Sequence, residues 1–515
     1  MAHLKHSVAS QKKKSFTLIY AAFIAGLCSI IYELLIATTV SYFLGDSIKY
    51  FSLTIGIYMA AMGIGSYVSK YVEDQLLERF IIAELLLGLL GGLSIPALYF
   101  SYALDGFFIP TYLFFTIAIG FLIGLEIPFL TRLMETYNTL KVNIANILSF
   151  DYFGALIATV SFPFILLPFF GTYQSSLLFG LVNMSIAFSI LYVFKEELSQ
   201  KFKKLNFFML LSSFILVITI AFAKISLHHW DQMLYEDRIV HSEQSRYQRI
   251  VLTKHKNDIR LYLDGNLQFS SIDEYRYHES LVLVPITISP KPIKNVLLLG
   301  AGDGMAVREL LKHETIEAIT LVDLDKSIIT LAKNNPHLIA LNQKSLDNPR
   351  VQIKTIDAFS FLSNNVHKFD LIISDLPDPN NNALARLYSK QFYTLIHKNL
   401  SPDGLFVTQA TSPYFATKAF WSIVKTIGAG GFKYTYPYHA SVPSFGEWGF
   451  VLASNYKIST QVTDIKIKTQ FLNEENFSTL FVFDKDIITS DVQINHLDRP
   501  ILLSYYLDGW RHYAH

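Results

Sequence analysis

Residues 295–304, Asn-Val-Leu-Leu-Leu-Gly-Ala-Gly-Asp-Gly, join a β-like apolar run to a glycine-rich turn. Gly300 and Gly302 are expected to let the backbone approach a nucleoside closely, as glycine turns after a strand do. A second β-like run ends in Asp323, about twenty residues further on, where an acid can bind ribose hydroxyl groups. The dinucleotide pattern is not matched, because Met305 stands three positions after Gly302. We therefore expect a nucleoside site, with a purely structural turn as the alternative.

Further carboxylates give this expected site its charge. Asp303 lies inside the turn, and Asp375 and Asp378 follow a third β-like run at residues 371–373. Open α/β sheets bind ligands at such carboxyl ends of strands. Carboxylates there would repel a phosphate, so we expect a nucleoside without phosphates beside a cationic group. One acid of the pair could also accept a proton, whereas a helix cap with a turn former is the structural alternative.

Three more residues have two readings each. Asp357 follows the run at residues 351–355 and could bind an adenine amino group, or cap the following helix. Tyr277 and His278 could belong to an amine site, or could be a core tyrosine beside a solvated charged pair. On its own, His278 fits the second reading better.

Residues 1–225 differ in composition from the rest of the chain. Hydrophobic residues make up 51% of the 515 residues, and the excess lies in this first part. A helix needs about 20 apolar residues to cross a bilayer. Seven runs approach this length: 16–39, 50–69, 80–103, 107–131, 148–170, 173–194 and 205–225. We therefore expect a multi-pass transmembrane helical domain in the cell membrane.

The distribution of basic residues predicts the membrane orientation. Lysine and arginine precede the first run and follow the second, fourth and sixth runs, which places the N-terminus in the cytosol. Seven crossings would then leave the C-terminal half outside, whereas a nucleoside metabolite is expected in the cytosol. We favour a cytosolic C-terminal half, which requires an even number of crossings. Either one of the seven runs, most readily one within 80–131, is not a simple span, or an eighth crossing is hidden.

Four acids lie within or at the edge of the apolar runs: Glu33, Glu84, Glu126 and Asp151. Acids at membrane depth are costly and often mark a cation path or a paired site. Hydrogen bonding between helices is the alternative.

The remaining chain divides into three parts. Residues 226–290 alternate in a strand-like manner and predict a small β-domain. Residues 291–455 alternate between strands and helices, which predicts an α/β domain with a mostly parallel sheet. Residues 456–515 form a tail with no chemical signature. The net charge of +1 gives no reason to expect nucleic-acid binding, and the single cysteine, Cys28, with no His/Cys cluster, suggests no metal site.

Several short motifs between residues 240 and 455 occur together in one known family. They are Tyr247-Gln248, Leu263-Asp264-Gly265 with Gln268, Asp273-Glu274 with Tyr277-His278-Glu279, the glycine turn, Asp323-Leu324-Asp325, Asp357-Ala358 and Asp375-Leu376-Pro377-Asp378-Pro379. In these motifs the chain resembles the spermidine synthases, the polyamine aminopropyltransferases. With its apolar first half it is similar to the membrane-bound bacterial branch of that family.

This resemblance implies a Rossmann-like fold of the S-adenosylmethionine-dependent methyltransferase type and a set of roles. The donor, decarboxylated S-adenosylmethionine, would be bound by Gln248, Gly300, Gly302, Asp303, Asp323 and Asp357. Asp303 and Asp375 would hold the ammonium of the aminopropyl group, and Asp375 would accept the proton. The diamine would be bound by Tyr277, His278 and Asp378.

The expected reaction is transfer of an aminopropyl group to putrescine, giving spermidine and 5'-methylthioadenosine, without a metal or other cofactor. A methyltransferase that uses S-adenosylmethionine is the enzymatic alternative, and a polyamine-binding membrane sensor or carrier is the non-catalytic one. We also expect a homodimer or a larger homo-oligomer. The chain departs from the soluble enzymes at Ala301, at Leu376-Pro377 and at Ser444-Phe445-Gly446, and the last two leave the choice of amine open.

Overall fold

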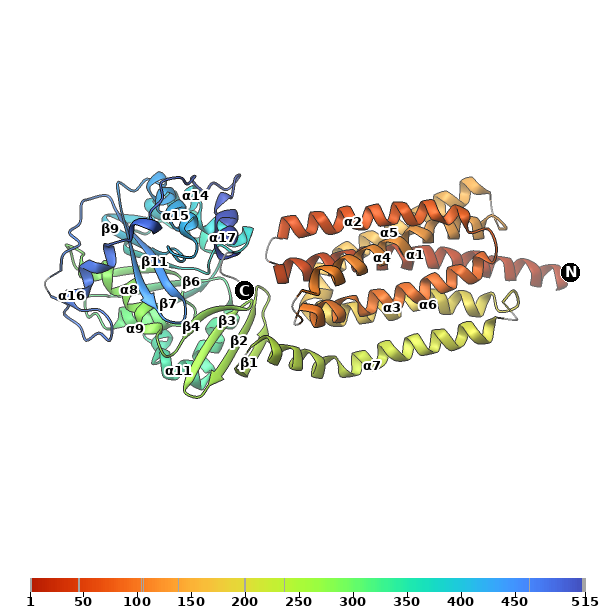
Figure 1. The fold of residues 1–515 in the computed structure, drawn as a ribbon, viewed down its shortest axis with the longest axis horizontal. Helices are drawn as coiled ribbons and strands as arrows, with labels where there is room; N and C mark the ends of the chain where they lie inside the picture. The colour runs from red at the N-terminus through yellow and green to blue at the C-terminus, as the bar shows by residue number, and fades with distance from the viewer. Residues whose placement is uncertain are drawn as a thin grey trace. The chain divides into compact units, whose positions relative to one another are not determined.

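The computed structural model describes residues 2–44, 47–102, 104, 106–137, 139–198, 201–235, 237–462 and 464–511. The chain forms two compact units that divide near residue 236 (Figure 1). The first unit contains the apolar runs, and the second contains both sheets. Each unit is described by itself.

Long helices make up the first unit (Figure 1). They are α1 (Ala2–Leu44), α2 (Ser47–Val68), α3 (Leu76–Tyr102), α4 (Phe108–Met134), α5 (Leu140–Ser161), α6 (Leu167–Val193) and α7 (Phe202–Leu234). Each of the seven expected runs falls on one of these helices, except that 148–170 continues from α5 through a π-helical turn, Phe162–Leu166, into the start of α6. Hydropathy therefore located the helices, although several extend beyond the apolar runs.

Six stretches among the described residues are long and apolar enough to cross a membrane. One of them, Leu140–Val193, has 54 residues. At about 1.5 Å per residue a straight helix of that length would far exceed the roughly 30 Å hydrocarbon core of a bilayer. Gly171 interrupts it with a non-helical φ of 66° and ψ of −177°. The irregular part of the unit therefore lies at residues 162–171, whereas α3 and α4, where we expected it, are continuous helices.

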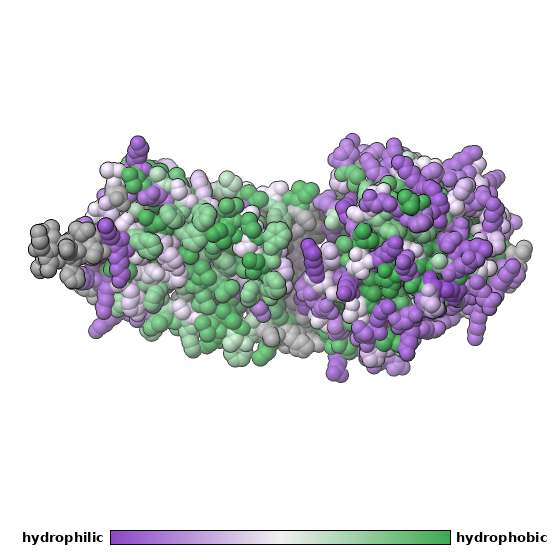
Figure 2. All heavy atoms as spheres, turned by 180° about the vertical axis from the view of Figure 1, so that it is seen from behind, coloured by the Kyte–Doolittle hydropathy of each residue, from purple (hydrophilic) through white to green (hydrophobic). Residues whose placement is uncertain are grey.

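Close backbone packing explains glycines in the apolar runs. A Cβ atom on Gly154 of α5 would lie 2.2 Å from the carbonyl oxygen of Phe23 in α1. A Cβ atom on Gly26 of α1 would lie 2.2 Å from the carbonyl oxygen of Asp151 in α5. Helices in lipid associate through such contacts between small residues. The outward-facing side chains of this unit are largely hydrophobic on the face shown in Figure 2, whereas those of the second unit are largely hydrophilic.

Two of the four acids form a buried contact. Glu84 of α3 and Glu126 of α4 are both buried, and their carboxyl groups lie close enough to interact. The side-chain amide of Asn183 in α6 donates to Glu84 Oε2 over 2.9 Å. Glu84 therefore joins α3 to α6 by a hydrogen bond, as the hydrogen-bonding alternative expects. Glu33 and Asp151 are partly buried.

The second unit begins with an antiparallel sheet of four strands in the order β1-β2-β3-β4. The strands are β1 (Arg238–Gln244), β2 (Arg249–His255), β3 (Asp258–Leu263) and β4 (Asn266–Ser270). His255 pairs with Asp258, so Lys256 and Asn257 form the turn between β2 and β3. Helix α8 (Glu274–Thr287) follows.

A seven-stranded sheet forms the centre of this unit, in the order β10-β11-β9-β8-β5-β6-β7. Its strands are β5 (Asn295–Gly300), β6 (Ala318–Asp323), β7 (Val351–Thr355), β8 (Phe369–Asp375), β9 (Leu400–Gln409), β10 (Tyr434–Val442) and β11 (Gly446–Ser454). Strands β5 to β9 pair in parallel, and β10 and β11 are antiparallel. The expected mostly parallel α/β sheet is present.

Helices cover both faces of the sheet. They are α9 (Met305–Leu311), α10 (Lys326–Asn334), α11 (Pro336–Asn342), α12 (Ala358–Asn364), α13 (Asn382–Ala385), α14 (Lys390–Asn399) and α15 (Thr417–Ala429). Val296 and Leu298 pack in one hydrophobic cluster, and Leu297 and Leu299 pack in another, as the two-residue period of a buried strand requires. The carboxyl ends of β5, β6 and β8 therefore lie at one edge between two filled cores.

The C-terminal tail is folded onto the second unit. It contains α16 (Glu474–Phe477) and α17 (Ile501–Arg511). The indole nitrogen of Trp421 donates to the carbonyl oxygen of Ile487 over 2.6 Å, and the Ser422 hydroxyl donates to that of Gln493 over 2.7 Å. The tail therefore packs along α15.

Candidate active site

The glycine turn lies against the neighbouring strand β8. Gly300 has a φ of +83°, and a Cβ atom there would lie 2.1 Å from the carbonyl oxygen of Asp375. Only glycine fits this contact. Ala301 adopts a φ of +60° without being glycine, a conformation that costs an L-residue about 1 kcal/mol. The turn therefore holds backbone in place at the end of β5.

Asp323 lies at the end of β6 against this turn. Its carboxylate accepts the N–H of Gly302 over 3.1 Å and the N–H of Asp325 over 2.8 Å. Burial raises the pKa of Asp323 to about 6, and the two backbone hydrogen bonds oppose this rise. The turn and this acid are thus brought together as the sequence predicts.

Gln248 reaches the same edge from the loop between β1 and β2. Its side-chain amide donates to Asp325 Oδ2 over 3.0 Å, and the Ser245 hydroxyl donates to the same oxygen over 2.6 Å. Asp325 also caps α10 by accepting the N–H of Ser327 over 3.0 Å. The small sheet therefore contributes a side chain to the same edge as the glycine turn and Asp323.

Asp357 caps α12 at the end of β7. Its side chain accepts the N–H of Ser360 over 2.9 Å and forms an ion pair with Arg386. Asp357 therefore caps the helix, as the alternative expects. Any contact with adenine would have to be made while this carboxylate is bound to Ser360 and Arg386.

Asp303 and Asp375 follow the two paired strands β5 and β8. The N–H of Met305 donates to Asp303 Oδ1 over 2.9 Å, and burial raises the pKa of Asp303. The Tyr277 hydroxyl donates to Asp375 Oδ1 over 2.6 Å. Burial raises the pKa of Asp375 to about 6, although the positive charge of His278 opposes the rise. The imidazole therefore acts electrostatically on both acids.

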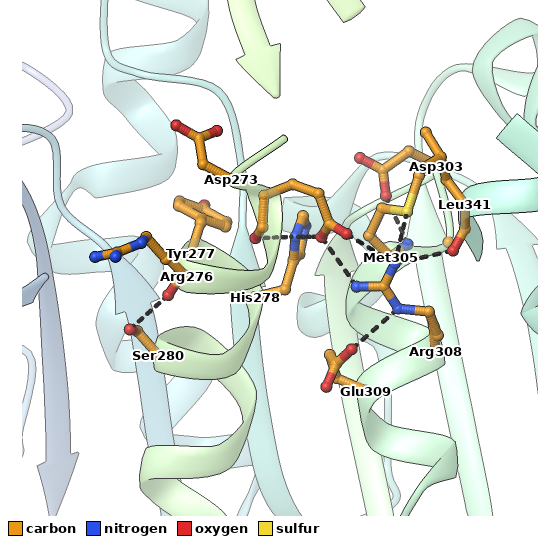
Figure 3. A network of polar contacts seen from close by, with 12 residues as sticks. Asp273, Arg276, Tyr277, His278, Ser280, Asp303, Met305, Arg308, Glu309 and Leu341 are labelled. Atoms are coloured by element: carbon orange, nitrogen blue, oxygen red, sulfur yellow. Dashed lines mark hydrogen bonds and ion pairs between the residues drawn. The ribbon is translucent and has the colours of Figure 1, made fainter. Parts of the chain in front are cut away.

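A chain of ion pairs holds this imidazole in place (Figure 3). Arg308 donates to both carboxylate oxygens of Glu274 over 2.9 Å each, and His278 Nδ1 lies 2.7 Å from Glu274 Oε2. Burial disfavours the charged imidazole, but its hydrogen bond to Glu274 raises the pKa of His278 to about 9. Burial also disfavours the carboxylate of Glu274, but His278 and Arg308 lower its pKa to about 2. The imidazole is therefore held as a cation.

Asp378 is held by side chains from the end of β9 and beyond. Its carboxylate accepts from the Gln409 amide over 3.1 Å and from the Thr411 hydroxyl over 3.0 Å. Burial raises the pKa of Asp378 to about 6, and these hydrogen bonds oppose the rise. Thr411 is fully buried with a φ of +59°, which is rare for a β-branched residue and is a kind of strain found at functional sites.

Comparison with known proteins gives the chain its family. A family model described as "Spermine/spermidine synthase domain" matches residues 274–464. The polyamine aminopropyltransferase 2 of Ralstonia nicotianae is 41% identical over 501 residues, which cover 96% of this chain and 98% of the relative. The chain belongs to the polyamine aminopropyltransferase family. It is therefore a transferase.

A second member of the aminopropyltransferase family is similar to this chain along most of its length. The polyamine aminopropyltransferase of Leptospira interrogans is 41% identical over 484 residues, covering 94% of this chain and 96% of the relative. The crystal structure of spermidine synthase from Thermotoga maritima is 27% identical, covers 48% of this chain and 86% of that chain, and has a TM-score of 0.45.

Two acids of the family motif lie in structural contacts of this aminopropyltransferase. Glu279 accepts the backbone N–H groups of Gln470, Phe471 and Leu472 over 2.7, 2.9 and 3.0 Å. Asp273 accepts the N–H of Ser444 over 2.6 Å and its hydroxyl over 2.8 Å. Glu279 therefore anchors a segment that follows the sheet, and Asp273 anchors the turn between β10 and β11. The contacts of Arg308, Gln409 and Thr411 could not be predicted from the sequence, because each residue finds its partner more than 30 residues away along the chain.

Proposed function

We propose that this aminopropyltransferase transfers the aminopropyl group of decarboxylated S-adenosylmethionine to putrescine, giving spermidine and 5'-methylthioadenosine. The observation that carries the proposal is the pair Asp303 and Asp375 at the ends of adjacent strands, beside a glycine turn and Asp323. Acceptor oxygens suit an ammonium group, which offers three N–H donors. The carboxylate of S-adenosylmethionine itself would be repelled by the same two acids.

On the donor side, Gly300 and Gly302 let the nucleoside approach the backbone. In this proposal Asp323 binds the ribose hydroxyls, Asp357 receives the adenine amino group, and Gln248 closes the site from the small sheet. When two substrates are held in line, the reaction between them gains most of its rate from this positioning.

On the acceptor side, Tyr277 and Asp378 flank the diamine. His278, which was expected to bind the diamine directly, instead acts on it through Asp375, because a charged imidazole would repel an ammonium group. Asp375 removes a proton from the attacking ammonium group, and a carboxylate with a pKa of about 6 is suited to this exchange near neutral pH. The freed nitrogen lone pair forms a bond to the carbon next to the sulfonium. The carbon–sulfur bond breaks, its electron pair stays on sulfur as a neutral thioether, and the secondary amine keeps the charge.

The test is turnover of the purified full-length protein with putrescine and each sulfonium donor in turn, with products identified by mass spectrometry. Spermidine and 5'-methylthioadenosine are expected only with the decarboxylated donor. Turnover only with S-adenosylmethionine would make the protein a methyltransferase, and amine binding without turnover would favour a sensor or carrier.

We further propose that the helical unit spans the cell membrane several times and that the catalytic unit faces the cytosol as part of a homodimer or larger homo-oligomer. The six apolar stretches and their hydrophobic outer surface support the membrane assignment. Compartment-specific reporters fused after residues 14 and 235 test the orientation. An inside report at 14 with an outside report at 235 would refute the cytosolic assignment.

A further inference from the structure

The C-terminal helix α17 contributes a side chain to the diamine end of the candidate site. The side chain of Tyr506 is partly buried and lies beside Asp378, close enough for its hydroxyl to interact with that carboxyl group. Gln409 and Thr411 donate hydrogen bonds to the same carboxylate. A carboxylate has about four acceptor positions, so these two bonds and the neighbouring Tyr506 hydroxyl leave little of it free.

A buried asparagine ties the start of α17 to the loop that follows β8. The side-chain amide of Asn495, which has no solvent exposure, donates to the carbonyl oxygens of Ala385 over 2.9 Å and Tyr388 over 3.1 Å. Its Oδ1 atom accepts the N–H of Leu502 over 3.3 Å. The Tyr388 hydroxyl in turn donates to the carbonyl oxygens of Leu376 and Pro377. The helix is therefore fastened to the segment that carries Asp378.

The other end of α17 packs on the segment that carries Thr411. A Cβ atom on Gly509 would lie 2.8 Å from the Cα atom of Ala416. The rings of Trp510 and Phe415 have centroids 5.0 Å apart. Residues three and four apart share a helix face, so Leu502, Tyr506 and Gly509 all face the domain. Tyr506 is thereby held between two anchored ends.

We propose that Tyr506 is a positioning residue that fixes Asp378 for a single ammonium group and so sets which acceptor amines the enzyme accepts. This inference rests on the proposed function and deepens it. With Gln409, Thr411 and Tyr506 around Asp378, a terminal ammonium group can approach this carboxylate from few directions. The family model ends at residue 464 and does not contain Tyr506.

The substitution Tyr506→Phe removes the hydroxyl and keeps the ring. Tyr505→Phe is the matched control, because Tyr505 is on the same helix and lies near Lys418. We expect Y506F to raise the KM for the diamine about tenfold, in keeping with the loss of a hydrogen bond to a charged group. The KM for the donor should stay within about twofold, since the proposed function places Asp378 on the diamine side of the site. Y505F should resemble the wild type.

Two further readouts separate positioning from a structural role. In Y506F the acidic limb of kcat/KM for the diamine should move to higher pH, because Asp378 loses an interaction that stabilises its charged form. Among diamines of three to five carbons, Tyr506→Ala should raise the relative kcat/KM of the longer amines, since it opens space beside Asp378. The melting temperatures of Y506F and Tyr506→Ala should be measured to check that both variants fold.

Equal KM values in Y506F and Y505F, or an equal rise for donor and diamine, would overturn the inference while wild-type turnover keeps the proposed function intact. A folded wild type without turnover on any diamine would overturn both.

Discussion

Glu274→Gln tests the ion-pair chain behind the proposed aminopropyl site. The change keeps the shape of the side chain and removes the charge that lies between His278 and Arg308. The pKa of His278 is raised from 6.5 to about 9, and this difference corresponds to about 3 kcal/mol at 1.36 kcal/mol per unit. Removing one partner of a buried ion pair costs about 3–5 kcal/mol. We therefore expect the catalytic unit to lose about 3 kcal/mol of stability at pH 6.

The sign of the pH dependence follows from both partners. His278 has a folded pKa above its unfolded value, so its stabilisation is complete below pH 6.5 and is lost as the pH rises through about 9. Glu274 has a folded pKa of about 2, so its stabilisation is present above pH 4.5 and is lost as the pH falls towards that value. The difference between wild type and E274Q should therefore be largest between pH 4.5 and 6.5 and should shrink by pH 9.5.

The assay is urea unfolding of the full-length protein, followed by a signal from the second unit at pH 6 and pH 9.5. Glu317→Gln is the control, because Glu317 pairs with Lys294 on the surface, where the side chains are 60% and 57% exposed. Such exposed pairs contribute about 0–1 kcal/mol. Equal destabilisation by E274Q and E317Q at pH 6, or an E274Q effect that is the same at both pH values, would refute the reasoning.

Three further predictions concern single positions. Asp375→Asn should lower kcat at least about 10²-fold and leave binding of 5'-methylthioadenosine nearly unchanged by calorimetry, because it removes the proposed proton acceptor; a near-normal rate would move that role elsewhere. Asp323→Ala should weaken binding of the donor by about 1–3 kcal/mol through unsatisfied ribose hydroxyls, and an equal loss for putrescine in the same titrations would instead indicate a folding defect. Ala301→Gly should raise stability by about 0.5–1 kcal/mol, because it relieves a φ of +60°, and a lower melting temperature would contradict this.

The sequence predicts the parts of the site that follow from local order along the chain. The turn after β5 and the strand-end acids Asp323 and Asp375 could be read because each follows an apolar strand directly. The pairing of Glu274 with Arg308 could not, because 34 residues separate them and no periodicity relates a helix residue to one on a later helix. The same holds for Tyr506, which reaches Asp378 only because the tail folds back over α15.

In the helical half, too, features that depend on neighbouring residues could be predicted from the sequence, and contacts between distant residues could not. Hydropathy located the seven apolar runs, since each is a continuous property of about 20 residues. It did not mark the end of α7 at Leu234, because a helix continues where its side chains become polar. It also could not show that Glu84 meets Glu126, which depends on how α3 and α4 pack.

The contact of Gly300 with the carbonyl oxygen of Asp375 limits which parts of this enzyme can change during evolution. The β5–β8 ladder pairs these two residues, so the donor turn and the proposed proton acceptor form one rigid piece that tolerates no added side chain. Helix α17, which lies beside Asp378, is bound by a different set of contacts. In the proposed mechanism, mutations in α17 can change the accepted amine while the β5–β8 piece is inherited unchanged, so related enzymes can diverge in product without passing through an inactive ancestor.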